Sequence, residues 1–288
     1  MLATEHLNHF TAPVPKPPFI ELPDAAPIPI LFEDRSVIAI DKPAGWMLVP
    51  HSWQRTGWNL QAAIASSLAA GHYWARSRNL KFLRYVHRLD ADTSGVLLFG
   101  RSFGAVETYG GLFETRQMEK RYLAIVHGKP RDAEWTCQLP LGSDPQAIGR
   151  VRVDEREGKD CETFFRVLRT KGNYALVEAH PLTGRQHQIR VHLNASGHGI
   201  LGDPLYGPSA EEMPYTRPPL ALRSVELAYR DPFTKRPVRI LAPTEAWLKT
   251  YGWTEREEKA VPQPPATTPA HAPKPGAEQR SAFPRRRV

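Results

Sequence analysis

The sequence contains little sulfur and no long apolar segment. Its two cysteines, Cys137 and Cys161, are the only ones in a chain of 288 residues, and their spacing fits neither a zinc site nor a disulfide framework. We therefore expect two buried thiols without a chemical role. The first residues lack the charged and apolar regions of a secretion signal, and the apolar runs are too short to cross a membrane. These absences predict a cytoplasmic protein with no membrane partner.

Glycine-rich phosphate loops and metal-ligand clusters are also missing from the sequence. His187 and His192 lie in a segment with helical patterning, where five positions rotate the side chain through roughly 500° at about 100° per residue. The two rings then point about 140° apart, so they cannot readily share one ion. The residues therefore offer no evident site for a nucleotide cofactor or a metal ion.

Proline gathers at the two ends of the chain, where half of the 28 prolines lie. Residues 255–288 combine proline with very few apolar side chains, and a segment that buries so little cannot repay the entropy lost on ordering. We predict a proline-rich extension over residues 1–27, one folded domain over residues 28–253, and a disordered, basic tail over residues 254–288.

Positive charge exceeds negative charge, because 38 Lys and Arg stand against 30 Asp and Glu. The net charge of +8 and the pI near 9.6 favour a polyanion partner, since each Lys or Arg that neutralises a phosphate releases condensed counterions. Charge alone leaves open a basic protein without such a partner, an acidic substrate or a membrane surface.

Short β-like segments dominate the middle of the chain. Residues 224–243 hold two β-rich runs around Asp-Pro-Phe-Thr-Lys, which predicts a hairpin. A helix is predicted over residues 59–71, with Asn59 as its N-cap and Gly71 at its end. Strands and helices do not alternate as a doubly wound parallel sheet requires. We therefore predict an α+β domain with a mixed, largely antiparallel sheet.

A second helix is predicted over residues 183–197. Thr183 and Gln186 have the spacing of a capping box, which would place Arg185 in the first turn of this helix. Free backbone N–H groups and the helix dipole favour anions at that position.

The stretch RYVHRLDADTSGVLLFG, residues 84–100, places charges inside a β-like segment. Alternate side chains share one face of a strand, but the Thr-Ser-Gly that follows Asp92 indicates a turn that begins near Asp90. An aspartate at the end of a strand can face a cleft and act as a nucleophile or a base. The alternative is that Asp90 caps the turn or pairs with an arginine.

Three motifs, taken together, resemble the RluA-type family of pseudouridine synthases. In order along the chain they are HRLDADTSG at 87–95, RYLAIVHG at 121–128 and GRQHQIRVH at 184–192. The segments DKPAG at 41–45 and GDPLYG at 202–207 are also similar to the family, so the resemblance covers about residues 30–243. Long motifs that match in order are far more specific than one spacing match.

The resemblance implies the pseudouridine synthase fold, with a central RNA-binding cleft and no cofactor. It implies an isomerisation in which the N1–C1′ bond of a uridine breaks, the uracil turns in place, and C5 bonds to C1′. The target base must first be extruded from the RNA into a pocket. Asp90 would be the catalytic residue, as a nucleophile at the sugar or the base, or as the base that removes a sugar proton.

The same resemblance assigns substrate-binding roles to Arg88, Tyr122 and Arg185. Tyr122 would stack on the uracil, Arg185 would pair with Asp90 and keep it ionised, and Arg88 would fill the gap left by the flipped nucleotide. Each has a structural alternative: Tyr122 in ordinary strand packing, Arg185 in a phosphate contact or a helix-face salt bridge, and Arg88 in a pair with Asp92.

The function expected from the sequence is therefore an RNA uridine isomerase that acts on ribosomal or transfer RNA as a monomer. Two alternatives remain at this point. One is an RNA-binding protein on the same fold without catalysis, and the other is a carboxylate-dependent hydrolase, such as a nucleosidase, in which water captures the sugar.

Overall fold

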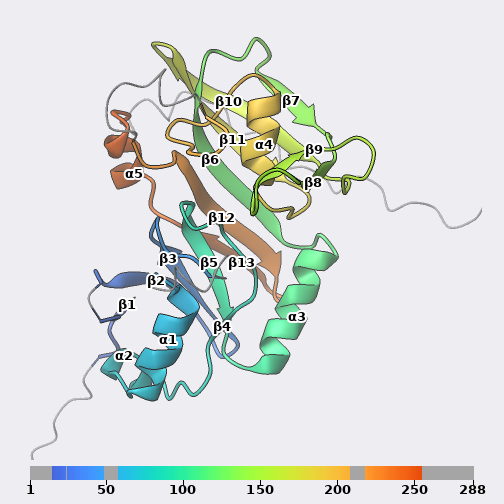
Figure 1. The fold of residues 1–288 in the computed structure, drawn as a ribbon. Coiled ribbons are helices and arrows are strands. Elements are labelled where there is room, and N and C mark those ends of the chain that lie inside the picture. The colour runs from blue at the N-terminus through green and yellow to red at the C-terminus, as the bar shows by residue number, and fades with distance from the viewer. Residues whose placement is uncertain (1–14, 24, 49–57, 208–217, 255–288) are drawn as a thin grey trace, which may run out of the picture.

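The computed structural model describes residues 15–23, 25–48, 58–207 and 218–254 (Figure 1). Within them, 11 strands form one sheet and two further strands form a separate hairpin. The strands are β1 (Phe19–Ile20), β2 (Ile28–Glu33), β3 (Val37–Lys42), β4 (Arg84–Tyr85), β5 (Ser94–Gly100), β6 (Glu119–His127), β7 (Glu134–Cys137), β8 (Leu141–Ser143), β9 (Val151–Val153), β10 (Thr163–Lys171), β11 (Tyr174–Pro181), β12 (Leu222–Arg230) and β13 (Pro237–Leu241).

The strands of the main sheet follow the order β1-β2-β3-β5-β12-β6-β11-β10-β7, with β4 beside β5 and β13 beside β12. The pair of β5 and β12 is parallel, and the other pairs in the sheet are antiparallel. The fold is therefore α+β with a mixed, largely antiparallel sheet, as the sequence predicted. The predicted hairpin is confirmed as β12 and β13, which pair from Glu226 with Leu241 to Arg230 with Pro237.

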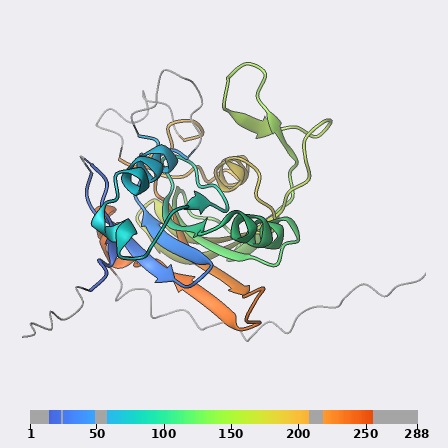
Figure 2. The same cartoon turned by 90° about the horizontal axis from the view of Figure 1, so that it is seen from below.

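Five helices fall within the described residues: α1 (Leu60–Ala69), α2 (Tyr73–Arg76), α3 (Phe103–Glu114), α4 (Gln188–Ala195) and α5 (Glu245–Thr250). Figure 2 shows α1 and α4 on one side of the sheet. The alternation of side chains along β3 explains why both faces of the sheet need cover. Ile38 and Ile40 belong to the core that includes α1, whereas Val37 and Ala39 belong to the core that includes α3.

The first predicted helix is confirmed, because the side chain of Asn59 accepts a hydrogen bond from the N–H of Ala62 and caps α1. The second predicted helix begins later than expected. His187 has a left-handed φ of 54° and precedes α4, which starts at Gln188. The Thr183 hydroxyl donates to Oε1 of Gln188 at 2.8 Å. Residues 183–187 therefore form a loop that this hydrogen bond closes, and not the first turn of a helix with a capping box, as the sequence predicted.

The main sheet also includes β1, which lies before residue 28, where we predicted that the folded domain starts. This strand has two residues and pairs at the edge of the sheet with β2, a place that tolerates neighbouring prolines. Ile20 and Leu22 are buried in the main core. Residues 1–14 and, apart from Thr254, the predicted tail lie outside the described residues. No helix in the described part of the chain is long and apolar enough to cross a membrane.

The hairpin of β8 and β9 projects away from the main sheet, as Figure 2 shows. It packs on the rest of the protein through a small core of its own, in which Leu141, Val151 and Cys161 meet Val191 of α4 and Tyr206. This arrangement brings the hairpin next to the N-terminal end of α4, where the site described below lies.

Candidate active site

Asp90 lies in the loop that joins β4 to β5. Its carbonyl accepts a hydrogen bond from the N–H of Thr93 at 3.2 Å, which forms the turn that the sequence predicted. Gly95 then pairs with Ser224 of β12 at a φ of +111°, and a Cβ atom there would lie 2.0 Å from the carbonyl oxygen of Ser224. Only glycine fits this close approach. The Ser-Gly pair therefore fixes where the chain leaves the Asp90 loop and enters the sheet.

Lys42 supports the backbone of the Asp90 loop. Its side chain is fully buried, and Nζ donates to three backbone carbonyls, among them those of Ala91 and Thr93 at 2.7 and 2.9 Å. Burial lowers the pKa of Lys42 to about 7, although the nearby charges of two aspartates oppose the shift. Lys42, in the DKPAG segment, thus ties the loop that carries Asp90 to the end of β3.

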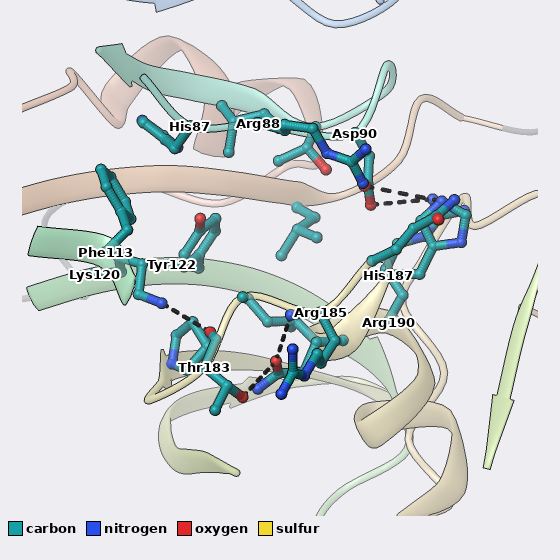
Figure 3. Close-up of a pocket in the computed structure, with 18 of the residues that line it drawn as sticks. His87, Arg88, Asp90, Phe113, Lys120, Tyr122, Thr183, Arg185, His187 and Arg190 are labelled. Atoms are coloured by element: carbon teal, nitrogen blue, oxygen red, sulfur yellow. Dashed lines mark hydrogen bonds and ion pairs between the residues drawn. The ribbon is translucent and has the colours of Figure 1, made fainter. Parts of the chain in front are cut away.

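The guanidinium that faces Asp90 belongs to Arg190 and not, as we predicted, to Arg185. Nη1 of Arg190 lies 3.4 Å from Oδ2 of Asp90 (Figure 3). Arg185 is exposed, and its Nε donates to the carbonyl of Asp160 at 3.3 Å. The reason is the later start of α4 at Gln188, which puts Arg190 in the first turn of the helix and leaves Arg185 in the preceding loop.

Arg190 is held in this position by Asp203. The two side chains form two hydrogen bonds, from Nε to Oδ2 at 2.8 Å and from Nη2 to Oδ1 at 2.7 Å. Burial alone would lower the pKa of Arg190, but the hydrogen bonds and the charge of Asp203 raise it above the ordinary value. Burial likewise acts to raise the pKa of Asp203, and Arg190 holds it below the ordinary value. Both groups therefore stay ionised behind Asp90.

His187 approaches the other oxygen of Asp90. Its Nε2 lies 3.8 Å from Oδ1, and its Nδ1 lies 2.8 Å from the hydroxyl of Tyr206. The left-handed backbone at His187 turns the ring inward, where it is almost completely buried. The Asp90 side chain itself keeps 23% of its surface exposed. The carboxylate is therefore flanked by two basic side chains and still open to a ligand.

Tyr122 lies in the same cavity as Asp90. This cavity has a volume of about 310 Å³, and Tyr122 of β6 lines it together with Asp90, Arg185 and Leu222. Burial raises the pKa of Tyr122 to about 12, against an opposing hydrogen bond with the Ser224 side chain. The hydroxyl is therefore protonated at neutral pH. A cavity of this size, lined by apolar side chains such as Leu222 and by several polar and charged ones, is suited to a polar small molecule or a base.

Lys120 and His87 line the part of the cavity away from Asp90 (Figure 3). Lys120 Nζ donates to the carbonyl of Thr183 at 2.8 Å, and burial together with the charge of Arg116 lowers its pKa to about 8. Burial lowers the pKa of His87 to about 3, so this ring is neutral and stacks on Phe113. Lys120 thus joins the strand of Tyr122 to the loop that carries Arg185.

Arg88 lines this cavity and also a second, larger one of about 870 Å³. Asp90 lines both cavities as well, so it lies where they adjoin. Exposed apolar side chains border the larger cavity, with Trp58 and Leu205 among them and Ile148 from the loop between β8 and β9. Arg88 is exposed, and its side chain forms no hydrogen bond or ion pair with another described residue. The alternative pair of Arg88 with Asp92 is therefore absent among the described residues.

The structure thus brings all four sequence-predicted residues, Arg88, Asp90, Tyr122 and Arg185, around one cavity. Arg185 does not make the predicted contact with Asp90, which Arg190 makes instead. Sequence reasoning missed the roles of Lys42, Arg190 and Asp203. A signal existed for each of them, because all three lie in quoted motifs. Which arginine of GRQHQIRVH faces Asp90 depends on the start of α4, and the residue pattern did not settle that start.

The cysteines and His192 lie away from this chemistry. Cys137 and Cys161 are buried free thiols, as predicted, and burial raises the pKa of Cys161 to about 11. His192 is buried, with Nδ1 at 2.9 Å from the hydroxyl of Thr163. Within the described residues, no group of three or more His, Cys, Asp or Glu side chains could hold a metal ion.

Comparison with known proteins finds relatives that are named as pseudouridine synthases. The model of a family described as RNA pseudouridylate synthase matches residues 36–195. The mouse protein named pseudouridylate synthase RPUSD2 is 39% identical over 186 residues, which are 65% of this chain and 32% of the mouse protein. The ribosomal large subunit pseudouridine synthase C of Escherichia coli is 35% identical over 227 residues, which are 76% of this chain and 67% of that protein.

Among solved structures, human RNA pseudouridylate synthase domain containing 1 matches with a TM-score of 0.59 at 23% identity, over 83% of this chain and 97% of that one. This likeness concerns the fold alone. The chain spans only about a third of the mouse relative. Because the family model covers more than half of the sequence, and the Escherichia coli relative matches at 35% identity over 67% of its length, the chain belongs to the RluA-type family of RNA pseudouridylate synthases.

Proposed function

We propose that this protein converts uridine to pseudouridine in RNA and that Asp90 is its catalytic residue. One observation carries the proposal: a partly exposed carboxylate lies where two cavities adjoin, flanked by Arg190 and His187 and in the same cavity as Tyr122. Family membership supports the same activity. Isomerisation needs no added group, so the residues of the chain suffice for the chemistry.

The smaller cavity is suited to the extruded uracil. In this proposal the base stacks on Tyr122, a contact worth about 1–3 kcal/mol, which offsets part of the few kcal/mol needed to unstack a nucleotide. The sugar then lies beside Asp90. The carboxylate acts as a nucleophile at the sugar or the base, or removes a sugar proton, and the N1–C1′ bond breaks. Rotation of the uracil within the cavity lets C5 bond to C1′, as the carboxylate is displaced from its adduct or the sugar proton returns. The proton on C5 then leaves to solvent, and N1 gains a proton.

The larger cavity is suited to the RNA around the target nucleotide. Arg88 is exposed between the two cavities, which supports its role in filling the gap left by the flipped base. Exposed aromatic and guanidinium groups at the border can stack on neighbouring bases. We propose Arg185 as a contact to a phosphate on the rim. The net charge of +8 supports a polyanionic partner.

Ribosomal RNA is the substrate that we propose first, because the Escherichia coli relative is named for the ribosomal large subunit, and transfer RNA is the second. We further propose that the protein acts in the cytoplasm as a monomer, with the catalytic domain bounded at residues 28 and 253 except for the β1 strand that joins its sheet.

The test uses RNA that carries tritium at uridine C5. Ribosomal RNA and transfer RNA transcripts with this label are incubated with the purified protein, and released tritium and free uracil are measured. The proposal expects tritium release with pseudouridine in the RNA and no free uracil. Binding without release would indicate an RNA-binding protein without catalysis, and free uracil would indicate a nucleosidase. Either result would overturn the proposal.

A further inference from the structure

The GDPLYG segment, residues 202–207, lies behind Asp90 and contacts both side chains that face it. Asp203 holds Arg190 through two hydrogen bonds. Tyr206 contacts His187 through its hydroxyl. The proposed reaction uses neither Asp203 nor Tyr206 directly. Their contacts nevertheless hold the side chains of Arg190 and His187 in the orientation in which these face the Asp90 carboxylate.

The hydroxyl of Tyr206 has two partners among the described residues. It accepts a hydrogen bond from the N–H of Val151 at 2.9 Å and lies 2.8 Å from Nδ1 of His187. An N–H group can only donate, so Val151 does not use the hydroxyl proton, which is available to Nδ1. Burial raises the pKa of Tyr206, which keeps that proton on the oxygen. Tyr206 can therefore donate to His187.

A donor at Nδ1 determines the state of the His187 ring. When the Tyr206 hydroxyl donates, Nδ1 presents its lone pair to it, and the ring proton of the neutral form then lies on Nε2. Nε2 is the atom that faces Oδ1 of Asp90 at 3.8 Å. Hydrogen bonds of this kind are often long without substrate and shorten when substrate binds. The proton on Nε2 thus points toward the carboxylate.

The Tyr206 ring is held in place independently of its hydroxyl. The guanidinium carbons of Arg190 and Arg150 lie 5.2 and 5.5 Å from the centre of the ring. The backbone of Tyr206 is also held, because its N–H donates to Oδ1 of Asp203 at 3.1 Å. Removing the hydroxyl should therefore leave the ring where it is.

We propose that Tyr206 is a positioning residue that holds His187 in its Nε2–H form, so that His187 donates to Oδ1 of Asp90 while Arg190 donates to Oδ2. Both oxygens of the carboxylate are then oriented by donors. Because Val151 belongs to β9, the same hydroxyl also connects the projecting hairpin to the active site. The catalytic consequence rests on the proposed function, and the state of the His187 ring does not.

The kinetic test compares variants in the tritium-release assay with labelled ribosomal RNA. Tyr206→Phe keeps the ring and loses the hydroxyl, and we expect kcat to fall about tenfold or more with KM within about threefold. His187→Gln keeps a side-chain N–H donor, so it should retain more activity than His187→Leu. In the His187→Gln background, Tyr206→Phe should cause no further loss of kcat.

A role of Tyr206 in packing alone would give a different pattern, with the same loss of activity in both backgrounds, and that result would overturn the proposal. Unchanged kcat in Tyr206→Phe would overturn it as well. Tyr251→Phe is the matched control, because the hydroxyl of Tyr251 also has two partners, the carbonyls of Pro219 and Leu220, away from the active site. This variant should keep wild-type kcat.

A second measurement reads the His187 ring directly and needs no activity. Long-range ¹⁵N–¹H NMR of the wild-type protein at pH 8 should show His187 with its proton on Nε2, and Tyr206→Phe should weaken that preference. A proton on Nδ1 in the wild type would overturn the proposal. If the wild type forms no pseudouridine, the proposed function fails, while the NMR result still decides the state of the ring.

Discussion

Arg190 joins two aspartates that lie far apart in the sequence. It forms two short hydrogen bonds with the buried Asp203 and reaches the partly exposed Asp90 with Nη1 at 3.4 Å. The planar guanidinium can serve both carboxylates at once because its five N–H groups point in fixed directions. The buried ion pair of Arg190 with Asp203 therefore fixes the position from which the guanidinium contacts Asp90, the proposed catalytic residue.

Replacing Arg190 with lysine should separate this role from simple charge. A lysine ammonium keeps the charge but cannot make the two-pronged contact to Asp203 and also reach Asp90. We expect Arg190→Lys to lower kcat about 100-fold, since small displacements at a reacting centre have effects of this size. In Arg185→Lys, KM should rise and kcat should stay. Steady-state kinetics with labelled RNA checks both, and the opposite pattern would return the pairing role to Arg185.

The pair of Asp203 and Arg190 should also contribute to stability. Asp203→Ala leaves a buried guanidinium without its main partner, which typically destabilises a protein by about 3–5 kcal/mol. Arg190 holds the pKa of Asp203 below its ordinary value, so the contribution is present above the unfolded pKa and is lost as pH falls through the folded one.

Urea unfolding checks this expectation at pH 7 and again well below pH 4. The difference in unfolding free energy between wild type and Asp203→Ala should be large at pH 7 and smaller in acid. Glu245→Ala breaks the exposed pair with Lys249 on α5 and is the matched control, for which we expect little change. A difference for Asp203 that grows in acid would contradict the assigned direction.

Tyr122→Phe tests the hydroxyl of the aromatic residue in the cavity. Burial raises the pKa of Tyr122 to about 12, so the variant loses a protonated hydroxyl and keeps the stacking ring. We expect kcat to fall about 100-fold if the hydroxyl assists proton transfer, with RNA affinity nearly unchanged. Tyr122→Leu removes the ring and should weaken binding by about 1–3 kcal/mol. Equal rates for wild type and Tyr122→Phe would restrict this residue to stacking.

Gly95→Ala tests the junction between the Asp90 loop and the sheet. The added Cβ would lie 2.0 Å from the Ser224 carbonyl at a φ of +111°, so we expect a loss of unfolding free energy of about 2 kcal/mol or more. Gly111→Ala lies in α3, where a Cβ meets nothing within 4 Å, and should stabilise by about 0.5–1 kcal/mol. Chemical denaturation gives the free energy of unfolding of both variants. An unchanged value for Gly95→Ala would contradict the close approach of Gly95 to the Ser224 carbonyl.

Local patterns in the sequence were sufficient for the elements that depend on local chemistry. Asn59 caps α1 because its side chain alone satisfies a free N–H, and the Asp-Pro-Phe-Thr-Lys run turns between β12 and β13 for similarly local reasons. The largely antiparallel sheet followed from the scarcity of helices. Which strands lie side by side did not follow, because the parallel contact of β5 with β12 joins segments more than 100 residues apart.

The candidate site was predictable as a set of motifs and not as a set of contacts. The motif containing Asp90 indicated both the carboxylate and the turn. The pattern around Arg185 favoured an earlier helix start, which tertiary contacts override, because the Gln188 side chain donates to the Glu162 carbonyl and the Thr163 hydroxyl. Its Oε1 also accepts from the N–H of Arg185. Lys42 is fully buried. The sequence did not predict this, because lysine is rarely buried without partners, and its partners here are backbone carbonyls of the Asp90 loop.

Asp90→Asn measures the central claim most directly, because asparagine keeps the shape of aspartate and removes only the charge. Wild type and variant are compared for tritium release from C5-labelled ribosomal RNA, with RNA affinity measured on the same samples. We expect the wild type to release tritium and form pseudouridine, and Asp90→Asn to release none while binding RNA within about threefold of wild type, since binding relies on stacking and phosphate contacts. Release by the variant at the wild-type rate would show that the Asp90 carboxylate is not the catalytic group.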